Sequence, residues 1–223
     1  MIILSLEGNI GAGKSSLLRR VESRLPPGVK IHMEPVHLFQ NFKGENPLKL
    51  FYQDPKEYAF FTQSHIIEAQ CTYFCERVQV EPIRILLSER NLFSPIMFTN
   101  TFFKMGWLSQ METEKLVENS QKIIRNVLQN KPMGADYMFY LQEYPQVCQR
   151  RIRQRGREGE NSITDIYLSQ LESEYEDYCE KFAEKNGQFS LRLIPPTISR
   201  KQKEEALLDF IEDIIKKHQN VWA

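Results

Sequence analysis

The sequence contains few cysteines, and they are widely spaced. Cys71, Cys75, Cys148 and Cys179 form no C-x-x-C pair, and none of the 4 histidines stands at a zinc-ligand spacing from them. Free, buried thiols in a reducing compartment are the expected state of such residues. The pattern therefore predicts neither a disulfide framework nor a structural metal site.

Long hydrophobic runs and an excess of one charge are also absent. No apolar stretch reaches the roughly 18 residues that a membrane-spanning helix needs, and the first apolar run, residues 1–6, meets Glu7 too early for a signal-peptide core. The 29 Lys and Arg residues balance the 29 Asp and Glu residues, which disfavours a non-specific polyanion binder. We therefore expect a cytoplasmic protein with neither a membrane nor a nucleic acid as partner.

What the chain does contain is an alternation of short apolar segments and long amphipathic ones. The short segments are nearly continuous apolar runs, typical of parallel strands covered by helices on both faces. We predict strands at residues 2–7, 29–34, 84–89, 137–142 and 189–194. We predict helices at residues 14–25, 55–80, 95–104, 112–129, 145–155, 166–185 and 201–218. Neither a repeat nor a linker interrupts this α/β pattern, so residues 1–223 are predicted to form a single domain.

One motif indicates a specific chemistry. The segment Gly8-Asn9-Ile10-Gly11-Ala12-Gly13-Lys14-Ser15 matches G-x-x-x-x-G-K-[ST], follows a predicted strand directly and opens a predicted helix. Its glycines let backbone N–H groups face a β-phosphate at the positive end of the helix dipole. Lys14 is expected to reach the β- and γ-phosphate oxygens, and Ser15 to offer its hydroxyl to Mg²⁺. Residues 8–16, including Ser16, are therefore predicted to bind a nucleoside triphosphate.

Two other nucleotide-binding classes fit the chain poorly. A GTP switch needs an N-K-x-D motif, but residues 130–133 read Asn-Lys-Pro-Met, and no D-x-x-G segment occurs. A motor or helicase needs a much longer chain than 223 residues. A small-molecule kinase is the natural interpretation of a short chain that begins with a phosphate loop.

Charged residues stand at the ends of two predicted strands. Glu34 ends the second strand, and Glu89 and Arg90 end the third. Ligands of open parallel sheets bind beyond the carboxyl ends of the strands. Two carboxylates and a guanidinium would therefore meet beside the phosphate loop if these strands lie next to the first. A solvated strand end and a local ion pair are the alternative explanations.

Five arginines occur among the eight residues 150–157. Arg151 and Arg155 stand four residues apart on one helix face, and Gly156 and Gly159 then allow the chain to bend. Positive charge of this kind stabilises a phosphoryl group during transfer. We predict an arginine-rich lid at about residues 151–161, rather than a charged helix end or a nucleic-acid patch.

These segments together resemble a known family. Gly8–Ser16, Glu34-Pro35-Val36, Phe61-Thr62-Gln63, Glu89-Arg90 and residues 150–160 occur in the order and spacing of the deoxyribonucleoside kinases. That family includes deoxycytidine, deoxyguanosine and mitochondrial thymidine kinases and the insect multisubstrate enzyme. The resemblance covers about residues 1–215. It implies a P-loop kinase fold with a five-stranded parallel sheet flanked by helices, and transfer of the ATP γ-phosphate to a deoxyribonucleoside 5′-hydroxyl with Mg²⁺.

The resemblance also implies roles for the residues at the strand ends. Glu34 matches the glutamate that takes the proton from the 5′-hydroxyl, and Glu89 matches a second glutamate, near Mg²⁺, that is also a candidate base. The choice stays open because it depends on distance to the proton; we favour Glu34 as base and Glu89, with Ser15, as metal ligand. Arg90 matches an arginine that steadies Glu34 or the 5′-oxygen, and Asn91 replaces the usual serine.

Further matches concern the two substrates. Arg151, Arg155 and Arg157 match lid arginines that bind ATP, and loop 195–200 matches one that lies against the adenine. Tyr52 and Glu160 match the pair that contacts the 3′-hydroxyl. Gln63 matches the glutamine that reads the base, for which a carboxamide offers both a donor and an acceptor. The remaining base-pocket positions are Val36, Phe39, Phe51, Ile66, Gln70, Pro95 and Thr99.

Two of these positions bear on base preference. Gln70 and Pro95 stand where deoxycytidine and deoxyguanosine kinases carry an arginine and an aspartate. Thymidine-accepting relatives have small apolar groups there, which leave space for a 5-methyl group. The resemblance therefore favours thymidine and deoxycytidine as substrates. Thr62 stands where the family often has Phe, and Phe60 or Phe61 could take that place.

Oligomeric state and two alternative functions complete the prediction. The helices predicted at 55–80 and 112–129 resemble those through which family members dimerise, so we expect a homodimer.

A nucleoside monophosphate kinase of the thymidylate kinase type shares the loop and lid, but Glu34 would repel its acceptor phosphate. A nonhydrolysing nucleotide-binding module is the third possibility.

Overall fold

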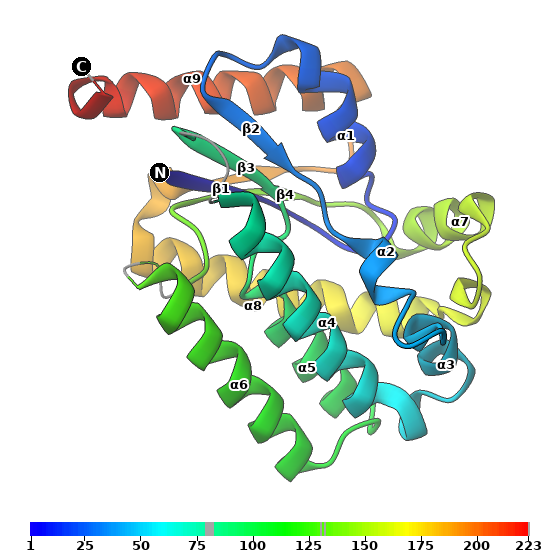
Figure 1. Ribbon diagram of the computed structural model, residues 1–223. Helices are drawn as coiled ribbons and strands as arrows, with labels where there is room; N and C mark the ends of the chain where they lie inside the picture. Colours follow the sequence, from blue (N-terminus) through cyan, green and yellow to red (C-terminus); the bar gives the residue numbers. More distant parts are fainter. Residues whose placement is uncertain (79–82, 130, 132, 223) are drawn as a thin grey trace.

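A parallel sheet forms the centre of the molecule (Figure 1). The computed structural model describes residues 1–78, 83–129, 131 and 133–222. Within these residues the sheet consists of β1 (Ile2–Glu7), β2 (Val29–His32), β3 (Ile85–Glu89), β4 (Tyr137–Leu141) and β5 (Leu191–Ile194). The spatial order is β2-β3-β1-β4-β5, and every neighbouring pair is parallel. The predicted five-stranded parallel sheet is confirmed.

Helices cover both faces of this sheet (Figure 1). On one side lie α1 (Lys14–Val21) and α9 (Arg200–Trp222), which pack against each other. On the other side lie α4 (Pro55–Val78), α5 (Ser94–Lys104), α6 (Gln110–Leu128) and α8 (Asp165–Asn186). The shorter helices α2 (Val36–Phe39), α3 (Pro47–Gln53) and α7 (Pro145–Arg155) gather at the carboxyl ends of the strands.

The residues of β1 explain why both faces are covered. Successive side chains of a strand point to opposite faces of the sheet, and all residues of β1 except Ile2 are buried. Ile3 belongs to a hydrophobic cluster with Leu171 of α8. Leu4 belongs to a second cluster that includes Leu207 of α9. A strand apolar on both faces therefore organises two cores, one on each side of the sheet.

Two predicted strands are shorter than expected. β2 ends at His32 rather than Glu34, because the backbone N–H of Glu34 turns toward the Glu89 carboxylate, at 3.5 Å, instead of continuing the ladder. β5 begins at Leu191 rather than Phe189, because a 3₁₀ turn occupies Gln188–Ser190. The third and fourth strands are each one residue shorter than predicted.

The helix boundaries also differ from the predicted ones, again for local reasons. The first helix ends at Val21, and a 3₁₀ turn, Glu22–Arg24, follows it. α6 begins at Gln110, two residues before the predicted start, because Ser109 and Glu112 form a capping box. The last two residues of the helix predicted at 55–80 lie outside the described residues. α8 and α9 extend beyond their predicted ends, and α7 matches its prediction.

Two helices were not predicted. α2 has only four residues, too few for a periodic pattern. α3 follows a clear signal, since Asn46 accepts a hydrogen bond from the Lys49 N–H at 3.1 Å and Pro47 takes the first helical position. Both helices place residues around the cavity described next. No helix in the described part of the chain is long and apolar enough to span a bilayer.

Candidate functional site

A cavity of about 830 Å³ opens at the carboxyl ends of β1, β2 and β3. The phosphate loop, helices α2 to α5, the lid and the start of α9 all contribute to its lining. Of the individually named site residues, Gly8, Asn9 and Thr99 lie outside that lining, and of the predicted adenine loop 195–200 only Arg200 belongs to it. Convergence of the strand ends beside the phosphate loop follows from the strand order, since β3 is adjacent to both β1 and β2.

The phosphate loop is held in shape by its own neighbours. A Cβ on Gly8, whose φ is +147°, would lie 2.6 Å from the carbonyl oxygen of Leu141, so only glycine fits there. The Asn9 side chain donates to the carbonyl of Leu168 at 2.8 Å. Asn9 therefore anchors the loop to α8 and does not face the cavity.

Lys14 is a buried ammonium group at the centre of the site. Its Nζ donates to the carbonyl oxygens of Gly8 and Asn9, both at 2.9 Å. Burial, and secondarily the positive charge of Arg90, lower the pKa of Lys14 to about 8, although nearby carboxylates oppose this shift. The group is thus poised between its charged and neutral forms at moderately alkaline pH.

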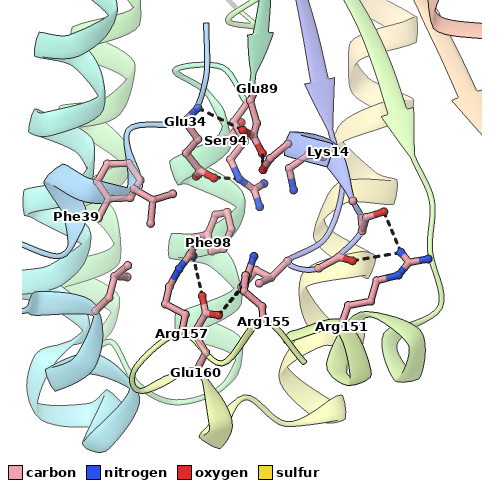
Figure 2. A pocket seen from close by; sticks show the side chains of 18 of the residues that line it. Lys14, Glu34, Phe39, Glu89, Ser94, Phe98, Arg151, Arg155, Arg157 and Glu160 are labelled. Atoms are coloured by element: carbon pink, nitrogen blue, oxygen red, sulfur yellow. Dashed lines mark hydrogen bonds and ion pairs between the residues drawn. The ribbon is translucent and has the colours of Figure 1, made fainter. Parts of the chain in front are cut away.

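The three charged residues at the strand ends form one cluster (Figure 2). The Nε of Arg90 lies 3.1 Å from Oε1 of Glu34, and Ser15 Oγ donates to Oε1 of Glu89 at 2.6 Å. Arg90 is a buried residue with φ +63°, a backbone conformation that is uncommon for a side chain of this size. Its guanidinium also donates to the hydroxyl of Tyr175. Arg90 is therefore oriented by the fold, with Glu34 beside it.

Ser15 and Glu89 have the chemistry of a magnesium site. A hydroxyl and a carboxylate are the oxygen ligands that Mg²⁺ takes from proteins, with phosphate oxygens and water completing the shell. Within the described ranges no group of three or more His, Cys, Asp or Glu side chains could hold an ion by itself. Mg²⁺ bound at this pair would therefore depend on phosphate oxygens as further ligands.

The lid arginines are arranged around one buried carboxylate. Glu160 accepts from Arg155 at 2.7 Å and from Arg157 at 2.9 Å, and these three side chains lie together across the cavity from Lys14 (Figure 2). Arg151 lies apart from them, beside the phosphate loop (Figure 2). Positive charge thus borders the cavity on two sides.

The end of the cavity around Gln63 and Gln70 is lined by uncharged side chains, and we call it the uncharged end. Gln63 donates its amide N–H to the carbonyl of Pro95 at 2.8 Å, and Gln70 donates to the carbonyl of Asn91 at 3.1 Å. Both amides are buried and therefore fixed in orientation. The other predicted base-pocket residues in this part of the lining are Val36, Phe39, Phe51, Ile66 and Pro95.

Comparison with protein-family models identifies the family of the chain. Residues 4–221 match the family described as "Deoxynucleoside kinase". The chain belongs to the deoxynucleoside kinase family. The match covers nearly the whole sequence, so the resemblance that the motifs predicted is confirmed.

Several curated kinases of this family are similar in sequence. Human mitochondrial thymidine kinase 2 is 27% identical over 180 residues, which cover 80% of this chain and 64% of that protein. The chain thus spans less than two thirds of the length of that relative. A probable deoxycytidine kinase of fowlpox virus is 28% identical over 78% of this chain and 70% of its own. A thymidine kinase of ictalurid herpesvirus 1 is 27% identical over 100% of this chain and 90% of its own.

Solved structures support the fold. A deoxyadenosine kinase from M. mycoides, with bound dATP, superposes with a TM-score of 0.73 at 19% sequence identity. The superposition covers 95% of this chain and 100% of that one. The P-loop kinase fold predicted from the sequence is thereby confirmed.

Several residues that line the cavity were not predicted from the sequence. Phe98 and Phe102 of α5 both line the cavity. They follow Pro95 at three and seven residues, the spacing of one helix face, and that signal could have identified them. Lys203 of α9, which lines the cavity, and Glu143, which is buried behind the lining, were missed as well. No local pattern marks either of these, because their partners come from distant parts of the chain.

Proposed function

We propose that this chain is a deoxyribonucleoside 5′-kinase that transfers the γ-phosphate of ATP to the 5′-hydroxyl of its substrate. One observation carries the proposal: a carboxylate, Glu34, faces the same cavity as the phosphate-loop residues Lys14 and Ser15. A kinase that acts on an alcohol needs a base and a phosphate cradle in one site. Membership of the deoxynucleoside kinase family supports the choice of acceptor.

In the proposed reaction Glu34 accepts the proton of the 5′-hydroxyl while that oxygen attacks the γ-phosphorus, and the bond from the γ-phosphorus to the β,γ-bridging oxygen breaks, so that ADP leaves. Arg90, whose Nε lies 3.1 Å from Oε1 of Glu34, would hold the carboxylate in place at the cavity. Lys14 and the lid arginines Arg155 and Arg157 would stabilise the charge on the transferring phosphoryl group. Ser15 and Glu89 would hold Mg²⁺, which supplies further positive charge at the phosphates.

We further propose that pyrimidine deoxyribonucleosides, thymidine and deoxycytidine, are the preferred acceptors. The uncharged end of the cavity supports this preference, since Gln63 can pair with a pyrimidine edge and neither Gln70 nor Pro95 brings a charge. Tyr52 and Glu160, which both line the cavity, would receive the 3′-hydroxyl. Three of the similar relatives bear the names of thymidine or deoxycytidine kinases.

A phosphoryl-transfer assay tests the proposal. Mg-ATP would be offered with thymidine, deoxycytidine, deoxyadenosine, deoxyguanosine or thymidine monophosphate. We expect turnover on the two pyrimidine nucleosides and none on the monophosphate. Turnover only on the monophosphate would assign the chain to the nucleotide kinases. If ATP binds and no acceptor reacts, the chain is a binding module.

We also propose that the protein is a homodimer that contacts its partner through α4 and α6. This proposal rests on the likeness of the two helices to those through which other members of the family associate.

A further inference from the structure

Glu143 is a buried carboxylate with no role in the reaction described above. It follows β4 and precedes α7, and only 5% of its surface is exposed. A buried charge is costly unless other charges and hydrogen bonds compensate it. The partners of Glu143 therefore indicate what the residue does.

Two cations from different elements meet at one oxygen of Glu143. Nη2 of Arg151, in α7, lies 2.9 Å from Oε2. Nζ of Lys203, in the first turn of α9, lies 3.5 Å from the same atom. Both cations also line the cavity. Glu143 thus ties the lid helix and the C-terminal helix together beside the site.

Arg151 carries this connection into the phosphate loop. Its Nη1 donates to the carbonyl oxygens of Gly11 at 3.3 Å and Ala12 at 3.1 Å. A guanidinium that is held at both ends by Glu143 and the loop carbonyls has a defined orientation. Figure 2 shows that Arg151 lies away from Arg155 and Glu160, so this contact is separate from the lid cluster.

The phosphate loop packs directly on α7, so the shape of the loop depends on where α7 and its residue Arg151 lie. A Cβ on Gly11 would lie 2.6 Å from the carbonyl of Cys148, which belongs to α7. Loop and helix are therefore in direct backbone contact at Gly11. A shift of α7 against the loop would alter the backbone that cradles phosphate.

We propose that Glu143 is a positioning residue for the triphosphate donor. It holds Arg151 against the carbonyls of the phosphate loop and Lys203 at the edge of the cavity, and so maintains the loop in the geometry that binds the donor. The effect concerns the donor and not the nucleoside, because Glu143 contacts neither Glu34 nor the uncharged end of the cavity. The proposal rests on the proposed function only for the identity of the donor as ATP.

The primary test is Glu143→Gln, which keeps the shape of the side chain and removes its charge. We expect the Kd for Mg-ATP, measured by calorimetry, and the KM for ATP to rise about tenfold, the effect of weakening one charge-assisted hydrogen bond. The KM for the nucleoside should stay within about twofold of its original value. Glu205→Gln is the matched control, because Glu205 of α9 forms an exposed ion pair with Arg24 of the 3₁₀ turn Glu22–Arg24, outside the cavity. It should leave both constants unchanged.

A double-mutant cycle tests whether Glu143 acts through Arg151. In an Arg151→Gln background, Glu143→Gln should raise the Kd for Mg-ATP by less than about twofold, because the contact is already broken. If the Gln variant does not fold, Glu143→Asp keeps the charge but shortens the side chain, and its Kd should rise by a smaller factor while the melting temperature is retained.

Three outcomes would overturn the proposal. They are an unchanged Kd for Mg-ATP in Glu143→Gln, equal rises in the KM for donor and nucleoside, and fully additive effects in the cycle. Calorimetry with Mg-ATP needs no acceptor. If the unmodified protein binds Mg-ATP but phosphorylates no nucleoside, the proposed function fails while the role of Glu143 is still measured.

Discussion

Arg90 is the residue on which the acceptor side of the site depends. It lies between two carboxylates, that of Glu34, just beyond the end of β2, at 3.1 Å and that of Glu7, the last residue of β1, at 3.9 Å. Glu7 is completely buried, and burial raises its pKa although Arg90 opposes the rise. The sequence pattern had assigned Glu7 no role, yet its side chain accepts hydrogen bonds from the Ser94 hydroxyl and the Asn91 N–H. It therefore supports the turn that carries Arg90.

The two candidate bases can be separated by matched substitutions. We expect Glu34→Gln to lower kcat by about 10² to 10⁴-fold, the usual value of a general base, while Mg-ATP still binds. Glu89→Gln should instead raise the Mg²⁺ concentration needed for half-maximal activity, because Glu89 is hydrogen-bonded to Ser15. The measurements are kcat at saturating substrates and a Mg²⁺ titration. Full turnover in Glu34→Gln would show that Glu34 is not the base.

The pKa of Lys14, lowered to about 8 mainly by burial and then by Arg90, predicts a pH dependence. Below this pKa the side chain is charged and attracts phosphate; above it the charge is lost. Glu89, Glu34 and Glu7 favour the charged form of Lys14 and so oppose this lowering of its pKa without cancelling it. We expect kcat/KM for ATP to fall about tenfold between roughly pH 7 and pH 9.

A second measurement serves as the control for this profile. At saturating ATP the bound phosphates keep Lys14 protonated, so kcat/KM for the nucleoside should not show the same titration near pH 8. A constant kcat/KM for ATP across this range would contradict the assignment of Lys14 as the titrating group.

At the scale of the elements, the lid contacts a helix that is far from it in the sequence. Its Ser162 hydroxyl donates to the carbonyl of Tyr52 at 2.8 Å, and Glu158 pairs with Lys49 at 2.7 Å. Both partners belong to α3, the helix that the sequence pattern did not reveal. Lid and α3 together therefore close one side of the cavity.

Two lid glycines provide a matched pair for testing this contact. Both have positive φ, +85° at Gly159 and +65° at Gly156. A Cβ on Gly159 would lie 3.0 Å from the backbone of Lys49, whereas a Cβ on Gly156 would meet open space. We expect Gly159→Ala to raise the KM for the nucleoside by roughly tenfold, because about 1 to 2 kcal/mol of strain would push the lid away from α3.

Gly156→Ala is the control for backbone strain alone. It should cost about 1 kcal/mol of stability, the usual penalty of a left-handed conformation, and leave the KM for the nucleoside within about twofold. The comparison requires KM values and melting temperatures for both variants. An equal rise in KM in the two variants would contradict the proposed contact between lid and α3.

At the scale of the whole molecule, the apolar side chains of α4 bear on the proposed dimer. Several of them have partners within the chain: Phe61 packs edge-on against Phe42 with ring centroids 5.5 Å apart, and Tyr73 lies 5.0 Å from the ring of His32. Ile66 lines the cavity. These three side chains of α4 therefore have their surroundings within a single chain.

The mass in solution tests the dimer directly. We expect sedimentation or light scattering to give a mass of about twice 26.4 kDa at micromolar concentration. The value should fall toward that of one chain on dilution if the interface is of moderate size. A mass of 26.4 kDa at all concentrations would contradict the homodimer.

The sequence alone determined the features that depend on short stretches of chain. Residues 8–15 specify a phosphate loop because glycines, Lys14 and Ser15 act at fixed spacing within one strand–turn–helix unit. The five strands and their parallel pairing follow from apolar runs separated by helical periodicity. Glu34, Glu89 and Arg90 could be placed at one edge of the sheet because parallel strands present their carboxyl ends there; their meeting beside the phosphate loop depended on the strand order.

Only the tertiary structure decided which distant groups meet. Glu143 and Lys203 are 60 residues apart, and Arg151 reaches Gly11 across 140 residues. No periodicity or motif relates such positions, because contact between them depends on the strand order β2-β3-β1-β4-β5 and on how α7 and α9 pack beside β4 and β1. The contacts between α3 and the lid have the same origin. Local signals thus specify which groups carry charge, while the packing of whole elements specifies which of those charges face one another.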